Sequence, residues 1–282
     1  MFSLPIAKII IKLIMKKSIF FTNAVILLTT IIFTSCGKDT LPGAGTRGDK
    51  TTSEGSLMSE YEANKGGLIF IQAHASDQTP LPTGRIWGQA AATIDYDDPN
   101  AEKTTLTFGN LHINSHVIPG GDDSYSLSDD FSDVFDGDST TITLTDSTNS
   151  LQDPPPILTT KIYGPQPFHV TIPQVISANS NLAWDVDPKS KDKVHLAIIY
   201  NGFHYQPGGT PQEYKQKYLE ASNNGLYTLS ATDLNNMPDD GVVQVTITQL
   251  SVKWVHVNLW FGPIDIPIVT AYSVSGTSTV DK

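Results

Sequence analysis

Cysteine is nearly absent from this chain, which contains one, Cys36, in 282 residues. A monomer with a single cysteine forms no internal disulfide, so a small disulfide-linked scaffold is excluded. The chain also lacks the Gly-x-Ser-x-Gly motif that marks many hydrolases with a serine nucleophile. Its histidines, serines and aspartates are numerous enough to form a triad by chance, so their presence carries no information. The sequence shows no convincing active site, and a protein that is not an enzyme is favoured.

Basic residues are scarce as well, with 18 Lys and Arg against 29 Asp and Glu and a net charge of −11. Residues 104–160 contain no Lys or Arg at all but nine Asp. An acidic chain repels the phosphates of nucleic acids, so DNA and RNA are excluded as partners. The same charge keeps the chain away from anionic lipid headgroups.

The first 35 residues read as a secretory signal peptide. Met15-Lys16-Lys17 is a basic start, Ile19 to Phe33 is an apolar run of 15 residues, and Thr34-Ser35 is a small-residue exit. A membrane-spanning helix needs about 20 apolar residues, so this run is too short. Met15 is an alternative true start, because residues 1–14 add a second apolar patch. Removing residues 1–35 leaves 14 basic and 29 acidic residues, a charge of −15.

The end of this run, Phe33-Thr34-Ser35-Cys36, resembles the lipobox of bacterial lipoproteins. The resemblance implies that Cys36 is acylated, with diacylglycerol and palmitate-type chains, and becomes the first residue. Cys36-Gly37-Lys38-Asp39 also resembles the start of Bacteroidetes-type lipoproteins, which implies an outer-membrane protein that faces the cell surface. More than one acyl chain satisfies the requirement for stable anchoring.

Residues 36–66 are rich in Gly, Thr, Ser, Lys and Asp, which is typical of a flexible tether. After them, short runs of β-branched and aromatic residues alternate with Gly, Pro and Asp turns, which predicts an all-β fold of β-sandwich type. The proline run Pro154-Pro155-Pro156 predicts a boundary between two sandwich-like domains, 67–153 and 157–282. A single larger sandwich is the alternative.

Local sequence patterns predict individual strands, one hairpin and one helix. Thr105–Phe108 and Leu111–Asn114 read as a hairpin that turns at Gly109-Asn110. Separate strands are expected at 242–250, 252–261 and 264–274. The capping signal Thr210-Pro211-Gln212-Glu213 predicts one short helix near 211–221. Leu182-Ala183-Trp184, followed by the strand 194–200, resembles the tryptophan strand of immunoglobulin-like and fibronectin type III sandwiches.

Strand alternation at 252–261 yields the main candidate ligand site. Val255, Val257, Leu259 and Phe261 share the face expected in the core, and the opposite face carries Trp254, His256, Asn258 and Trp260. Flat aromatic rings between hydrogen-bonding groups suit the stacking and polar contacts of a sugar, so this face is a candidate glycan platform. The alternative is that it packs against a second sheet, since Trp is usually buried.

Two stretches of the sequence carry residues of the types that bind metal ions. Asp95, Asp97, Asp98 and Asn100 place oxygen ligands in one loop, as calcium requires, although the spacing is not that of an EF-hand. A solvated acidic turn explains the same residues. His112 and His116 lie about 13 Å apart if they stand on one strand, too far for a shared zinc, and are expected to be surface or loop histidines.

Three functions remain open on these observations. The first is a lipid-anchored envelope protein with a non-enzymatic binding or adhesion role, with glycan or another envelope protein as the partner. The second is a lipid-anchored enzyme acting on glycans, since a pair of catalytic carboxylates can come from separate strands. The third is a structural subunit of an envelope assembly, which would present a large apolar patch.

Overall fold

The computed structural model describes residues 67–77, 85–93, 95–96, 104–105, 109–120, 125–145, 156–190, 193–200, 214–259 and 262–282, all within the compact unit Glu60–Lys282. Strands account for 65% of these residues and helix for 2%, which confirms the predicted all-β class. The elements are β1 (Leu68–Ser76), β2 (Trp87–Thr93), β3 (Asp95–Tyr96), β4 (Thr104–Thr105), β5 (Asn110–Ile113), β6 (His116–Pro119), β7 (Tyr125–Asp130), β8 (Ser139–Thr145), β9 (Pro156–Tyr163), β10 (Val170–Thr171), β11 (Val175–Ile176), β12 (Asn181–Trp184), β13 (Val194–Tyr200), β14 (Lys215–Ala221), β15 (Leu226–Thr228), α3 (Ala231–Leu234), β16 (Val242–Leu259) and β17 (Gly262–Val280).

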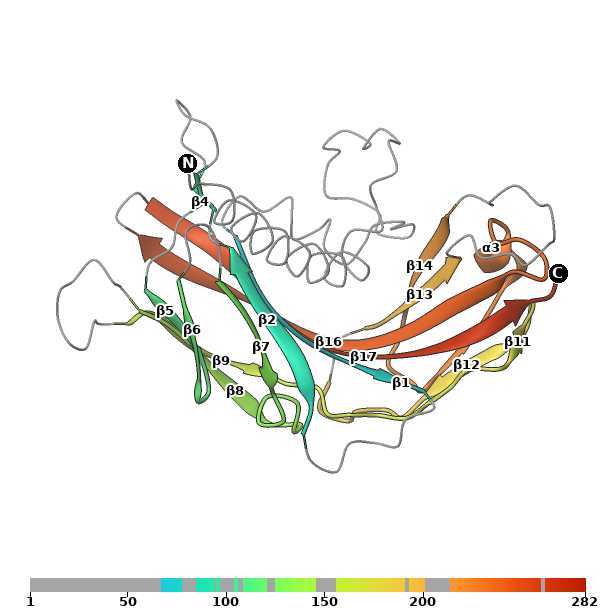
Figure 1. Cartoon of the computed structure of the whole chain (residues 1–282), viewed down its shortest axis with the longest axis horizontal. Coiled ribbons are helices and arrows are strands. Elements are labelled where there is room, and N and C mark those ends of the chain that lie inside the picture. The colour runs from blue at the N-terminus through green and yellow to red at the C-terminus, as the bar shows by residue number, and fades with distance from the viewer. Residues whose placement is uncertain are drawn as a thin grey trace, which may run out of the picture. The chain divides into compact units, whose positions relative to one another are not determined.

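An eight-stranded sheet forms the largest part of the fold, in the order β14-β13-β16-β17-β1-β2-β7, with β11 also paired to β17. β16 and β17 run side by side along their whole lengths (Figure 1), from Val242 opposite Thr279 to Leu259 opposite Gly262. The three strands expected over 242–274 are therefore two longer ones. Ser251 pairs opposite Thr270 within the ladder, so no break in hydrogen bonding occurs there.

A four-stranded sheet, β6-β5-β8-β9, lies against this large sheet. Residues of both sheets, such as Leu111 and Ile142 on one side and Ile71 and Ile268 on the other, join one hydrophobic core. The three-stranded sheet β10-β12-β15 contributes to the same core through Leu182. Sheets that bury their inner faces against each other form a sandwich, as the strand spacing predicted. Its immunoglobulin-like variant stays a prediction.

The predicted hairpin at Gly109-Asn110 is wrong. β5 pairs with β6 on one edge and with β8 on the other, and the chain turns at Asn114-Ser115 instead. Asn114 adopts a positive φ of 50°, which asparagine tolerates better than most residues. Its side chain also binds β8, because Asn114 Oδ1 accepts from the Thr141 amide at 2.8 Å. Asn114 therefore serves both the turn and a contact with a strand that is distant in sequence.

The position predicted for the helix is also wrong. Residues 215–221 form β14, which pairs with β13 over its full length, from Tyr200 opposite Lys215 to Val194 opposite Ala221. A helix this short is marginal without tertiary contacts, so pairing with the sheet outweighs the local capping signal. The short helix lies at Ala231–Leu234, where Ser230 and Asp233 form a reciprocal capping box.

Strands from both sides of the proline run belong to the eight-stranded sheet. β1 pairs in parallel with β17, from Ile69 opposite Ile268 to Ser76 opposite Ser275. Pro156 is the first residue of β9, a position where proline removes no ladder hydrogen bond. The division into domains at 67–153 and 157–282, and its alternative of a single larger sandwich, stay predictions.

Candidate functional site

The outer face of β16 near its end at Leu259 carries the described part of the predicted platform. Trp254 is 48% exposed, and His256 and Asn258 are exposed as well. Val257, on the opposite face, is buried, and Val255 packs against the core. The alternation predicted for this strand is confirmed over these residues. Trp260 and Phe261 lie outside the described residues, as does the side chain of Leu259.

β17 extends this face by one more strand. Trp254 pairs opposite Pro267, His256 opposite Asp265, and Asn258 opposite Pro263. His256 Nδ1 lies 2.9 Å from Asp265 Oδ1, and both side chains are about 60% exposed. We call the exposed side chains of Trp254, His256, Asn258, Pro263 and Asp265 the Trp254 face. It presents a flat indole beside an imidazole, a carboxylate and an amide.

The other tryptophans show that exposure here is not a general property of the residue type. Trp184 is buried in the core, and its Nε1 donates to Asn223 Oδ1 at 3.1 Å. Trp87 on β2 is 64% exposed, although no sequence pattern predicts a role for it. Its strand neighbours Gly88 and Ala90 face inward: Ala90 is core, and a Cβ on Gly88 would lie 3.0 Å from Phe131. Small inward residues leave no pattern of large apolar side chains, which is why the orientation of Trp87 was missed.

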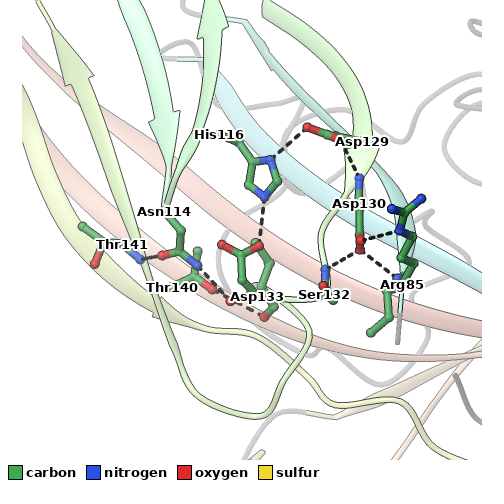
Figure 2. A network of polar contacts seen from close by, with 11 residues as sticks. Arg85, Asn114, His116, Asp129, Asp130, Ser132, Asp133, Thr140 and Thr141 are labelled. Atoms are coloured by element: carbon green, nitrogen blue, oxygen red, sulfur yellow. Dashed lines mark hydrogen bonds and ion pairs between the residues drawn. The ribbon is translucent and has the colours of Figure 1, made fainter. Parts of the chain in front are cut away.

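A second polar cluster centres on His116, which is not a surface histidine as predicted. Its side chain is 11% exposed and lies between two carboxylates (Figure 2). Nδ1 is 3.1 Å from Asp129 Oδ2, and Nε2 is 2.9 Å from Asp133 Oδ1. The ring packs on Phe131 with centroids 4.6 Å apart. We call His116, Asp129 and Asp133 the His116 network.

The carboxylates of Asp129 and Asp133 favour the charged form of His116. Burial of the ring lowers its pKa, but hydrogen bonds and charge from Asp133 and Asp129 outweigh that effect, so the pKa of His116 is raised above 6.5. The backbone amide of Asp130, and then the hydrogen bond from His116, hold the pKa of Asp129 below 3.8. An imidazolium can donate from both nitrogens, which is what two carboxylate partners require.

The backbone around this network is held by polar contacts and by the core. Asn114 Nδ2 donates to the Asp133 carbonyl at 2.8 Å. Asp130 turns away from His116 (Figure 2), accepting from the Ile86 amide at 2.9 Å and lying 3.8 Å from Arg85 Nε. Phe131, Val134 and Phe135 are fully buried and anchor the acidic segment to the core.

The structure does not describe the predicted calcium site as a whole. Asp95 lies in β3 with its side chain outside the description, and Asp97, Asp98 and Asn100 lie outside the described residues altogether. Within the described ranges, no group of three or more His, Cys, Asp or Glu is placed to hold a metal ion. His112 and His116 stand on neighbouring strands, where His112 pairs opposite Val117 and His116 opposite Ile113.

The lipid-attachment prediction concerns Cys36, which lies outside the described residues. In the part of the chain that the structure describes, no helix has the length and apolar character needed to cross a bilayer. No known protein family matches the chain, and no curated protein matches it.

Proposed function

We propose that this protein is a lipid-anchored component of the cell envelope with a non-enzymatic binding role, and that its ligand is a glycan. The observation that carries the proposal is the Trp254 face, where a half-exposed indole stands in line with hydrogen-bonding side chains. The strand below it is rigidly paired, since every residue of β16 from Val242 to Leu259 has a partner on β17. Side chains on such a strand keep a fixed spacing.

The chemistry of the face favours a sugar over a fully apolar ligand. An indole offers a broad apolar surface for the CH groups of a sugar ring. Beyond it, His256 and Asn258 follow at intervals of about 6.6 Å along the strand, and both can donate and accept hydrogen bonds to hydroxyls. Asp265 supplies a further acceptor. A linear glycan is favoured because these groups form a row.

The anchor supports the placement at a membrane. The lipobox-like ending at Cys36 would carry the acyl chains, and residues 36–66 separate Cys36 from β1 in sequence. The charge of −15 beyond residue 35 keeps the protein surface away from anionic headgroups, so acyl chains are the main membrane contact. The Cys-Gly-Lys-Asp start is the basis for proposing the outer membrane and its cell-surface side.

Glycan binding is tested by screening the mature chain without lipid on a glycan array, in the presence and absence of calcium. Trp254→Ala should remove the signal on every glycan that the wild type binds. Trp87→Ala is the matched control, because Trp87 is also exposed but lies outside the Trp254 face. Equal losses in both variants, or unchanged binding by Trp254→Ala, would contradict the assignment of this face.

Anchoring is tested separately with Cys36→Ala. We expect this variant to leave the membrane fraction or to remain unprocessed, because each buried CH₂ of an acyl chain contributes about 0.8 kcal/mol to membrane binding. The measurement is membrane fractionation followed by a high-salt wash. A variant that stays with the membranes after the wash would show that Cys36 is not the anchor.

A further inference from the structure

The two sheets meet along an edge where each ends in a strand with one hydrogen-bonded neighbour. Among the described strands, β6 pairs only with β5, and β7 pairs only with β2. His116 stands on β6, Asp129 on β7, and Asp133 in the turn that follows β7. Side chains of the His116 network therefore connect the two sheet edges.

We propose that His116, Asp129 and Asp133 form a pH-dependent latch that holds the edge strands β6 and β7 together. The latch is closed when the imidazole carries both protons and each carboxylate accepts one N–H. It depends on geometry, because one ring reaches carboxylates at 3.1 and 2.9 Å on opposite sides. A neutral imidazole has one N–H, so it can donate to only one of the two aspartates. Its other nitrogen then presents a lone pair to a carboxylate, and that side of the latch is lost.

The charged groups that face the ring are few. From β7 the ring meets Asp129, and from the following turn it meets Asp133. Asp130, the next acid on β7, is directed to Arg85 and to backbone amides instead. β5 presents Ile113 opposite His116. Phe131 covers one side of the ring, so water has limited access to it.

The direction of the pH dependence follows from these partners. The pKa of His116 is raised on folding, so its contribution is complete below 6.5 and is lost as pH rises through the folded value. The pKa of Asp129 is lowered on folding, so its contribution is complete above 3.8 and is lost as pH falls through the folded value. Between these limits the contributions of His116 and Asp129 are both complete. Each unit by which the pKa of His116 or Asp129 differs between the folded and unfolded states favours the closed latch about tenfold.

The first test needs no variant. The ¹⁵N chemical shifts of the histidine rings in purified protein, followed by NMR from pH 5 to pH 10, report the protonation of His116. We expect His116 to titrate above 6.5 and to show N–H character at both nitrogens below that point. A titration at or below 6.5, or a neutral tautomer at pH 6, would overturn the latch.

The second test asks whether protonation of His116 controls the sheet edge. Hydrogen exchange of the β6 and β7 amides, corrected for the intrinsic rate, should accelerate between pH 6 and pH 9 in the wild type. In His116→Gln this acceleration should be absent. His169→Gln is the matched control, because His169 lies 2.9 Å from Asp185 but both side chains are 63% exposed. The same pH response in wild type and His116→Gln would refute the proposal.

If His116→Gln fails to fold, Asp129→Asn provides the test. This variant should lower the pH at which His116 titrates, and an unchanged titration would refute the proposal.

Discussion

The Trp254 face and the His116 network contain the same kind of pair, a histidine beside an aspartate, at similar separations. His256 Nδ1 is 2.9 Å from Asp265, and His116 Nε2 is 2.9 Å from Asp133. The side chain of His256 is 60% exposed, whereas that of His116 is 11% exposed and has a second carboxylate. Equal distances therefore do not imply equal roles.

Burial accounts for the difference. An exposed ion pair exchanges contacts with water at little net gain, about 0–1 kcal/mol, and its groups stay available to a ligand. In the His116 network the imidazole has lost most of its water, although Asp129 and Asp133 remain 46% and 40% exposed, so the ring nitrogens need protein partners. The Trp254 face is consequently the better binding surface, and the His116 network is the better structural element.

The largest expected effect comes from cleaving the chain between the His116 network and the Trp254 face. They lie on opposite sides of the proline run at 154–156, yet β1 and β2, which precede the run, share a sheet with β17. We expect limited proteolysis to yield no stable fragment on either side, because each fragment would expose one part of a common core. Mass spectrometry of the digest gives the answer. A protease-resistant fragment ending near residue 153 would favour two domains.

The next effect is Phe131→Ala, which removes the ring beneath His116. Phe131 is fully buried, so its truncation should lower the free energy of unfolding by about 3–5 kcal/mol through loss of packing and a cavity. Urea unfolding measures this change. Phe131→Leu is the matched control and should lose clearly less, since most of the volume is kept. A loss below about 1 kcal/mol would mean that the turn is not anchored through Phe131.

A smaller effect compares the two histidines directly. His116→Gln should lower the free energy of unfolding at pH 6 by about 1 kcal/mol, because it removes charged hydrogen bonds from a mostly buried ring to carboxylates that water partly screens. His256→Gln should change it by no more than about 0.5 kcal/mol, as is usual at exposed positions. Equal losses would show that burial does not separate these pairs.

The smallest effect on stability is expected for Trp254→Ala. About half of this side chain already contacts water, so the free energy of unfolding should change by about 1 kcal/mol or less. Trp184→Ala, in the core, should cost about 3–5 kcal/mol under the same conditions. The melting temperatures of the two variants provide the comparison. A large fall for Trp254→Ala would identify it as a packing residue and remove the basis for the Trp254 face.

Much of the β-structure could be predicted because alternation is a local property. Thr140-Thr141-Ile142 and Val243 to Ile247 place alternate residues on one face, and the structure pairs them as strands. The helix expected at 211–221 failed for the opposite reason. Its capping residues are local, but the partner strand β13 that captures residues 215–221 is not visible in the local pattern.

The sequence by itself determined the strand content and the inward face of β16 around Val257, because periodicity and apolar character are carried by neighbouring residues. Only the tertiary structure decided that β1 lies beside β17 and that His116 lies between Asp129 and Asp133. Asp129 and Asp133 lie 13 and 17 positions from His116 in the sequence. β1 and β17 are separated by far more of the chain. Which sheet edges meet depends on how the whole core packs, and no short stretch of sequence contains that information.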